Sequence, residues 1–385
     1  MVAVAAIWGL LLISWAYPAS GGNAGATFVP GPNLNQGRNH HVLTTLPDGR
    51  VAVFGGIRIS SNAGVALHNF EIWDPGTNQF TLFNMPSHID AALARLQDGR
   101  YLLAGSSDFP DNLNNADVFN PNGNTINAVG VMHMAHAYCS AATLTDGRVL
   151  VVGAEQNEPV NGGDLFNPNL GTFASAAVPS PVLTYPIVLP TQDNQAVILG
   201  GAISGYPRRQ VDLYNPASNS TSTLIPTLFP ERSFIAFVPL RDCLDSHRLA
   251  DGRYLLAARQ NTEFLFTFDP ATKQFANYLD LPAGLEPLSH PLVDAARGRA
   301  YVVAQVGFTS PIKLRIYTVD LVHQKINSPN GYYQLPDDFA WFGTTALLPG
   351  GRLLLVGGEE NFSNPTTRKA SAKTWFAIVS AGRYC

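Results

Sequence analysis

Apolar and polar segments alternate along this chain in units that each contain one tight turn. In the first unit Asp48-Gly49-Arg50 stands between two apolar segments, the second of which runs from 51 to 54. Asp-Gly in this setting favours a β-hairpin, because glycine adopts positive φ without a steric penalty. Further turns, complete or degenerate, are Asp98-Gly99-Arg100, Asp146-Gly147-Arg148, Asp193-Asn194-Gln195, Asp251-Gly252-Arg253, Arg297-Gly298-Arg299 and Gly350-Gly351-Arg352. Their central residues, 49, 99, 147, 194, 252, 298 and 351, are separated by 50, 48, 47, 58, 46 and 53 residues. A near-constant period of this size indicates one structural unit repeated radially or in a stack.

The segment after each turn is apolar at consecutive positions rather than at alternate ones. Examples are 51–54, 101–104, 149–152, 196–199 and 353–356. A strand that is apolar on both faces is expected to be covered on both faces. Neighbouring units of a radial array would provide that cover.

A second turn follows in most units, where an aromatic residue precedes Asx-Pro. The copies are Trp73-Asp74-Pro75, Phe119-Asn120-Pro121, Phe166-Asn167-Pro168, Tyr214-Asn215-Pro216 and Phe268-Asp269-Pro270. Asx-Pro suits the first two positions of a type I turn, and the more polar segment after it is typical of an outer edge strand. Each unit is therefore predicted to be a four-stranded antiparallel blade, and the chain an all-β, seven-bladed β-propeller. The repeats fill residues 26–385, which we expect to form a single domain.

The seventh unit is one strand short, because little chain follows the apolar segment near 375–379. Residues 26–30, which precede the first unit, are predicted to supply the missing outer strand.

These features resemble the kelch repeat. The period near 50 residues, the Gly-Gly pairs at 55–56, 200–201 and 357–358, and the aromatic-Asx-Pro turns are similar to the central propeller of the galactose oxidase superfamily. The resemblance covers roughly residues 26–380 and specifies the fold. A WD40 propeller fits less well, since Trp73-Asp74 is the one Trp-Asp pair.

Residues 1–25 are expected to be a secretory signal peptide. Residues 1–16 are apolar and uncharged, and small and polar residues follow. The segment has no basic residue at its start, so an uncleaved anchor or a misassigned start remains an alternative. On the first interpretation the protein is secreted, with no membrane span after removal of the signal. The net charge of −4 and the lack of a Lys/Arg run argue against nucleic acid as a partner, and we expect a monomer.

Of the three cysteines, Cys139 falls in a predicted inner strand and is expected to be a small buried side chain. Cys243, in an insertion of the fifth unit, and the terminal Cys385 could form a disulfide after export. No CxxC pair is present, which excludes a zinc ribbon.

The connections that lie opposite the Asp-Gly turns are the most variable part of the chain. They include loops 57–68, 106–115, 155–162, 202–209 and 359–373. Loops held by a rigid scaffold are where function concentrates, so we expect the ligand site on this face.

Histidine is frequent where the chain enters the first strand of a blade. Counted back from the first residue of each Asp-Gly turn, Arg38, His88 and His136 share position −10, and His41 and His290 share position −7. Equivalent positions of different blades are expected to converge on the central axis. The predicted ligand-binding residues are Arg38, His41, His88, His136, Tyr185, Arg232, His290 and Trp341.

Two interpretations of the histidines stay open. His41, His88, His136 and His290 could hold one transition metal, since imidazole binds Fe, Cu and Zn. Alternatively they form a polar rim that is hydrogen-bonded to loop backbone. Copper-radical oxidation, which the resemblance would imply, needs a Cys crosslinked to a Tyr, a Tyr-His pair and a late His. The chain has no Tyr-His dipeptide and no histidine after His323. We therefore do not expect that activity, and no cofactor is implied.

The hypotheses for function come from three classes. The first is a secreted binding propeller that recognises an extracellular glycan or protein. The second is a carbohydrate-active enzyme, metal-assisted through the histidines, and the third is a purely structural role. We expect binding rather than catalysis. Each of the three hypotheses is an analogy, because fold alone does not determine function.

Overall fold

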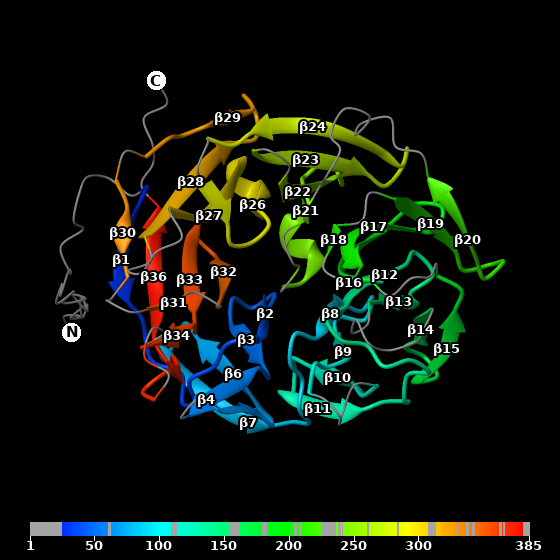
Figure 1. The fold of residues 1–385 in the computed structure, drawn as a ribbon, viewed down its shortest axis with the longest axis horizontal. Helices are drawn as coiled ribbons and strands as arrows, with labels where there is room; N and C mark the ends of the chain where they lie inside the picture. The colour runs from blue at the N-terminus through cyan, green and yellow to red at the C-terminus, as the bar shows by residue number, and fades with distance from the viewer. Residues whose placement is uncertain are drawn as a thin grey trace, which may run out of the picture.

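The computed structural model shows a closed ring of seven antiparallel sheets around a central axis (Figure 1). The described residues are 25–379, apart from 61–62, 109–113, 154–161, 179–182, 204–205, 208–209, 225–235, 238–239, 241, 260–261, 283–284, 307–312, 330, 336–338, 341–342, 362–363 and 365. The predicted seven-bladed propeller is therefore confirmed, and most blades have the four strands expected.

The first four blades follow the sequence repeat. Blade one contains β2 (Val42–Thr45), β3 (Val51–Phe54), β6 (Asn69–Asp74) and β7 (Gln79–Asn84). Blade two contains β8 (Ala92–Arg95), β9 (Tyr101–Ala104), β10 (Ala116–Asn120) and β11 (Thr125–Ala128). Blade three contains β12 (Ser140–Thr143), β13 (Val149–Val152), β14 (Gly163–Asn167) and β15 (Thr172–Ala176). Blade four contains β16 (Thr184–Pro190), β17 (Ala196–Ile203), β19 (Val211–Asn215) and β20 (Ser220–Leu224), and β18 (Tyr206–Pro207) pairs with β17.

The last three blades are less regular. Blade five contains β21 (Ala236–Phe237), β22 (Tyr254–Arg259), β23 (Glu263–Asp269) and β24 (Gln274–Asp280). Blade six contains β25 (Leu285–Pro287), β26 (Leu292–Asp294), β27 (Arg299–Val306), β28 (Lys313–Asp320), β29 (Lys325–Ile326) and β30 (Tyr333–Gln334). Blade seven contains β32 (Thr344–Leu348), β33 (Arg352–Val356), β36 (Thr374–Val379) and β1 (Ala26–Pro30). Two 3₁₀ helices, η1 (Leu244–His247) and η2 (Ala295–Arg297), lie in blades five and six.

The Asp-Gly turns are closed by their own side chains. Gly49 has φ +86°, and the Asp48 carboxylate accepts hydrogen bonds from the backbone N–H and the guanidinium of Arg50. The same two contacts recur in the turns at 98–100, 146–148 and 251–253. Arg100, Arg148 and Arg253 therefore serve the hairpin locally, whereas Arg50 also donates to Asn124 Oδ1 and to the Pro121 carbonyl of blade two.

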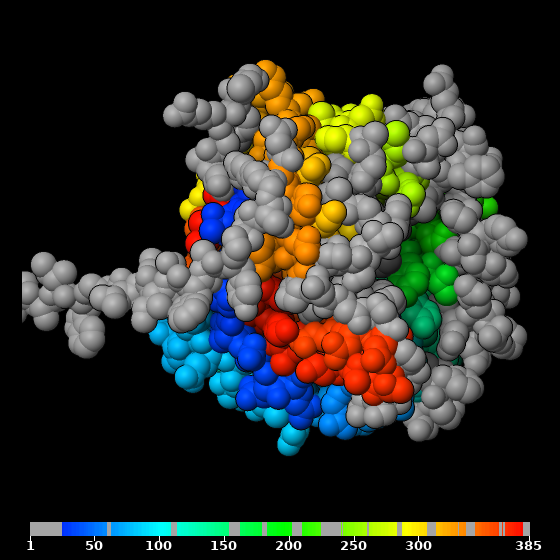
Figure 2. Space-filling view, turned by 60° about the vertical axis from the view of Figure 1, so that its left-hand side comes forward, coloured from blue at the N-terminus to red at the C-terminus, as the bar shows by residue number. Residues whose placement is uncertain are grey.

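The ring is closed by strand β1, as the sequence predicts. β1 pairs antiparallel with β36, and the register runs from Ala26 opposite Val379 to Pro30 opposite Trp375. Figure 2 shows the corresponding blue and red segments side by side on the surface. Phe28 also stacks on Tyr333 of blade six, with ring centroids 4.4 Å apart. The first described strand is thus tied both to the end of the chain and to the neighbouring blade.

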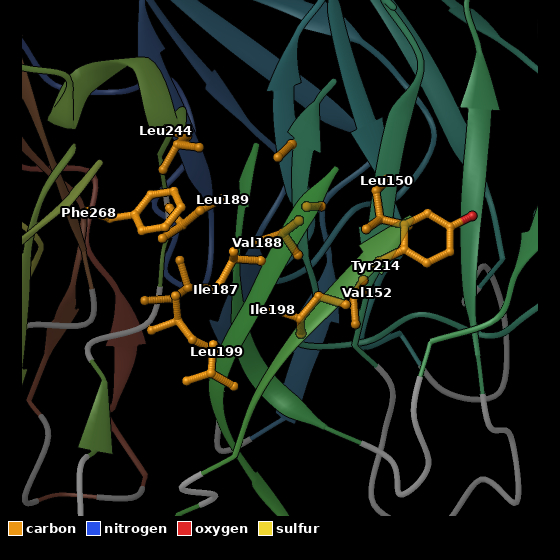
Figure 3. Close-up of a cluster of buried hydrophobic side chains, with 14 of the residues drawn as sticks. Leu150, Val152, Ile187, Val188, Leu189, Ile198, Leu199, Tyr214, Leu244 and Phe268 are labelled. Atoms are coloured by element: carbon orange, nitrogen blue, oxygen red, sulfur yellow. The ribbon is translucent and has the colours of Figure 1, made fainter. Parts of the chain in front are cut away.

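The core lies between the blades. The second strand of blades one, two and three is buried along its length, as the consecutive apolar positions predict. In the cluster of Figure 3, side chains of β13, β16 and β17 meet Tyr214 of β19 and Phe268 of β23. Leu244 of η1 joins them on the side of Phe268 and Leu189. Burial of apolar surface against both neighbours contributes about 25 cal/mol per Å² and stabilises the ring.

Two of the connections opposite the Asp-Gly turns form a sheet of their own. Strands β4 (Ile57–Ser60) and β5 (Ala63–Ala66) from blade one join β31 (Phe339–Ala340), β34 (Glu359–Glu360) and β35 (Lys369–Ala370) from blade seven. Loops that were predicted as variable thus bridge the two blades at the closure point. We call this side of the ring the loop face, and the side with the Asp-Gly turns the turn face.

Candidate functional site

The three residues at position −10 are buried and have the same contacts. Arg38, His88 and His136 are at most 1% exposed. Each donates to the carbonyl of the glycine 17 residues later, at the end of the second strand of its own blade, over 2.9, 2.8 and 2.5 Å. Each also reaches a carboxylate on the third strand of the blade, Glu71, Asp117 or Asp164, over 2.5, 2.8 and 3.0 Å. We call these pairs the latches.

Two of the latch carboxylates also accept hydrogen bonds from backbone N–H groups. Glu71 accepts from the N–H groups of Asn35 and Gln36, and Asp164 accepts from those of His133 and Met134. Burial raises the pKa of Asp164, but the hydrogen bonds from His136 and His133 outweigh it, so that the net pKa lies below the usual range. Both oxygens of Asp164 thus accept hydrogen bonds, from His133 at one oxygen and from Met134 and His136 at the other.

Blade two differs in one detail, for which the sequence gives the reason. Pro86 occupies the position of Gln36 and Met134 but has no N–H to donate. Asp117 Oδ1 is buried and has no hydrogen-bond partner among the described residues. In blade two the hydrogen bond to the latch carboxylate, at Asp117 Oδ2, thus comes from the His88 imidazole.

The latches also connect neighbouring blades through their backbone. The carbonyls of Arg38, His88 and His136 accept from the N–H groups of Gly358, Gly56 and Ser106, each in the preceding blade. The approach is so close that a Cβ added to Gly55 would lie 1.9 Å from the His88 carbonyl oxygen. This contact requires glycine after the second strand, and it explains the Gly-Gly pair. Arg38, His88 and His136 are therefore ring-assembly residues.

The position −7 histidines are also engaged. His41 Nε2 lies 2.9 Å from Thr344 Oγ1 of blade seven, and His290 Nδ1 accepts from the N–H of Ala257. The His290 ring packs edge-on against His247 of η1, with centroids 5.4 Å apart. Both histidines thus join elements from different parts of the chain.

The described residues do not fit a copper or other transition-metal site. Both ring nitrogens of His88 and of His136 face oxygen acceptors of their own blade. In the described part of the chain, no three His, Cys, Asp or Glu side chains are grouped so that they could hold one ion. The hypothesis that His41, His88, His136 and His290 share a metal gains no support from their placement. His88, His136 and His290 hydrogen-bond backbone groups, as the alternative expects, whereas His41 contacts the Thr344 hydroxyl.

Position −8, two residues after the latch position −10, has an unusual backbone conformation. His40, Asp90, Tyr138 and Tyr185 occupy it in blades one to four, and their φ angles are +54°, +48°, +50° and +54°. Non-glycine residues in this left-handed region cost about 1–3 kcal/mol each and cluster at functional sites. His40, Asp90 and Tyr138 precede the innermost strands β2, β8 and β12, and Tyr185 is the second residue of β16, so all four lie where the chain enters these strands from the loop face. We call them the mouth residues.

The mouth residues form two neighbouring pairs. The Asp90 N–H donates to the His40 carbonyl, and the Tyr185 N–H donates to the Tyr138 carbonyl. His40 Nδ1 lies 2.8 Å from Asp90 Oδ2, with the imidazole 28% and the carboxylate 4% exposed. The rings of Tyr138 and Tyr185, both partly exposed, have centroids 4.9 Å apart at an interplanar angle of 47°. A histidine–aspartate pair and an aromatic pair thus occupy one register in four consecutive blades.

The structure separates the sequence-predicted site residues into groups. Tyr185 is at the mouth, whereas Arg38, His41, His88, His136 and His290 are buried. Arg232 and Trp341 lie outside the described residues. The sequence analysis missed Asp90 and Tyr138, although counting back eight residues from each turn selects them together with His40 and Tyr185. It also missed the latch carboxylates, which stand three residues before the Asx of the second turn.

The axis is crossed below the mouth by residues 242–249 of blade five, which we call the plug. Asp242 forms an isolated parallel β-bridge with Leu43 of blade one, and Cys243 packs among apolar side chains of blades one and two. The predicted disulfide between Cys243 and Cys385 is wrong, because the insertion carries Cys243 inward as a buried free thiol. Burial raises the pKa of that thiol to about 12.

His247 holds the plug in place. Its Nδ1 lies 2.8 Å from the Pro291 carbonyl and its Nε2 2.9 Å from Asp242 Oδ1, so both nitrogens donate. Burial lowers the pKa of His247, but the charge of Asp242 and the two hydrogen bonds outweigh it and leave the net pKa raised. The plug is thus fixed by a buried imidazolium–carboxylate pair.

Comparison with known proteins agrees with this architecture. No protein-family model and no curated protein matches the sequence. Among solved structures, a fungal alcohol oxidase of the AA5 family, in complex with copper, superimposes with a TM-score of 0.61 at 11% identity. The match covers 91% of this chain and 75% of the oxidase. At that identity the likeness concerns the fold alone, and the chain shares a propeller fold with the oxidase.

Proposed function

We propose that this propeller is a binding protein whose loop-face mouth recognises a neutral carbohydrate. The observation that carries the proposal is the register of left-handed residues His40, Asp90, Tyr138 and Tyr185, of which all but the buried Asp90 are partly exposed. Four consecutive blades keep a strained backbone at one position, and the side chains there are polar or aromatic. Such strain persists where the surrounding structure imposes it, and it is a pointer to function.

The chemistry of the two pairs suits a sugar. Tyrosine has an apolar ring face and a polar tip, so the Tyr138–Tyr185 pair can stack on the C–H groups of a pyranose ring and hydrogen-bond its rim. The His40–Asp90 pair, held at 2.8 Å, can accept from and donate to adjacent hydroxyl groups. Apolar stacking with a few placed polar groups is the usual composition of a small-molecule site.

A glycan array followed by titration of the hits tests the proposal. We expect a neutral oligosaccharide to bind, and Tyr138→Ala together with Tyr185→Ala to weaken its affinity at least about tenfold. The matched control is Tyr278→Ala, which removes a partly exposed tyrosine from the outer strand β24. A glycan that binds both variants equally, or a protein partner in place of any glycan, would overturn the proposal.

A second candidate function is acid–base catalysis on the bound sugar. The observation that favours it is the partly exposed His40 imidazole, which is oriented by the less exposed Asp90 carboxylate. A base held by a third group is the arrangement of many enzymes. Incubation with the bound glycan and mass spectrometry of the products distinguishes the two functions. Catalysis requires a product that His40→Gln no longer forms.

We also propose that the protein acts outside the cytoplasm, as the predicted signal peptide at 1–25 implies. No helix among the described residues is long and apolar enough to span a bilayer. Expression of the full chain in a secreting host, with N-terminal sequencing of the exported protein, tests this location.

A further inference from the structure

A cavity of about 370 Å³ lies on the turn face, at the end of the axis opposite the mouth. It is enclosed by the lower ends of the innermost strands of blades two, three and four, and by the plug. This is the face opposite the one on which the sequence predicts a ligand site. The cavity is separate from the proposed carbohydrate site, because none of the mouth residues lines it.

Two arginines from different elements face this cavity. Arg95 is the last residue of β8, and Arg248 follows η1 in the plug. Arg95 Nη1 lies 4.0 Å from Asp245 Oδ2, which is beyond hydrogen-bond distance, and the Arg248 guanidinium lies 5.9 Å from the centroid of the Tyr254 ring. Neither guanidinium donates a hydrogen bond to any described residue.

The arginines of the Asp-Gly-Arg turns on the same face behave differently. Arg100, Arg148 and Arg253 each pair with the aspartate of their own turn at 2.6–2.7 Å. The guanidinium groups of Arg95 and Arg248 thus retain N–H donors in the planar arrangement that binds a carboxylate through two parallel hydrogen bonds. With Asp245, they leave the lining with a formal charge of +1.

The rest of the polar lining is uncharged and bears hydroxyl or amide groups. Gln97, Thr143, Thr145 and Gln192 lie around the cavity. Thr143 Oγ1 donates to the Arg95 carbonyl over 2.6 Å, and Gln97 Nε2 donates to the Thr145 carbonyl over 3.0 Å. The hydroxyl protons of Thr143 and Thr145 are already donated, so these oxygens can accept, whereas the glutamine amides can still donate and accept; the combination suits a polyhydroxylated ligand.

We propose that this cavity binds a uronic acid. The carboxylate would lie between Arg95 and Arg248, and the ring hydroxyls would meet the threonine and glutamine side chains. A volume of about 370 Å³ is at the small end of ligand pockets and limits the ligand to one or two sugar rings. The inference does not depend on the proposed function of the mouth, since the two sites share no residue.

Titration of the full-length protein with D-glucuronate, D-glucose and acetate at physiological salt tests the proposal. Glucuronate is expected to bind at least about tenfold more tightly than either glucose or acetate. Acetate that binds as tightly as glucuronate would show that the cavity holds an adventitious ion only. Glucose that binds as tightly would show that the arginines are not used. Either result overturns the proposal, and so does a lack of glucuronate binding.

Two variants locate the site. Arg95→Met and Arg248→Met, each with an unchanged melting temperature, are expected to weaken glucuronate binding at least about tenfold. Arg253→Met removes an arginine of the same face that pairs with Asp251 and does not line the cavity, and it should bind as the wild type does. The mouth variant Tyr185→Ala should also bind glucuronate normally. Loss of binding in either control would place the ligand elsewhere.

Discussion

The latches and the mouth residues lie two positions apart in the same blades, yet they differ in almost every physical respect. Arg38, His88 and His136 are buried, have regular partners and hold blades together. His40, Asp90, Tyr138 and Tyr185 have strained backbone, and three of the four are partly exposed. One register stabilises the ring and the other costs stability, which teaches that a repeat can place assembly and recognition side by side.

The largest expected effect is in a latch. Arg38→Met leaves the Glu71 carboxylate buried without its cation, and removal of one partner of a buried pair costs about 3–5 kcal/mol. We expect a loss near the lower end, because Asn35 and Gln36 still donate to Glu71. Urea unfolding measures it. Arg100→Met, in a half-exposed turn pair, should cost less than about 1 kcal/mol. Equal losses in the two variants would mean that the latch is not an assembly contact.

The second largest loss of stability is expected at Gly55, which packs directly against the carbonyl oxygen of His88. Gly55→Ala places a Cβ 1.9 Å from the His88 carbonyl oxygen at φ +58°. The conformation alone costs about 1–2 kcal/mol, and the clash between blades adds to it, so we expect a loss above about 2 kcal/mol. The matched control is Gly99→Ala, at φ +88° with no atom within 4 Å of the Cβ, which isolates the conformational term. The same measured loss for both variants would contradict close contact between the blades.

The plug offers a pH test of a third buried pair. Since the folded pKa of His247 is raised above its ordinary value of 6.5, its contribution is complete below that pH and is lost as pH rises through the folded pKa. Unfolding free energy should therefore fall between pH 6.5 and the folded pKa, and the fall should be absent in His247→Gln. Urea midpoints of the two proteins across this range provide the measurement. A wild-type slope that the variant retains would assign the titration to another group.

The smallest effect on stability is expected at the mouth. His40→Gly relieves a left-handed backbone at φ +54° but loses the pair with Asp90. These terms oppose each other, so we expect the unfolding free energy to change by less than about 1 kcal/mol in either direction. Binding of the mouth ligand should nevertheless be lost. A destabilisation as large as that of Arg38→Met would place His40 among the assembly residues.

Local chemistry made part of this structure predictable. The Asp-Gly turns, the doubly apolar strands and the closing strand Ala26–Pro30 follow from backbone preferences and from the need to cover apolar faces. The same turns also group Arg38 with His88 and His136, because equal distance from a turn means equal height in a blade. The long step of 58 residues marks an insertion in blade five.

Other features depend on contacts between distant segments. A histidine before an inner strand can face the axis or its own blade, and only the acid on the third strand decides the direction for His88 and His136. The insertion that carries Cys243 could extend outward, but its apolar side chains find cover among blades one and two. The positive φ of Tyr138 and Tyr185 likewise could not be predicted from the sequence, because tyrosine seldom adopts this conformation.

The sequence by itself determined the propeller, its seven blades and the way the ring closes, since these rest on short-range turn chemistry repeated at a fixed period. The tertiary structure alone decided which neighbours of each turn are buried and which are presented to a ligand. That choice depends on partners 28 to 33 residues away within a blade and on carbonyls of the adjoining blade. Burial and hydrogen bonding over such separations are fixed only when the ring is assembled.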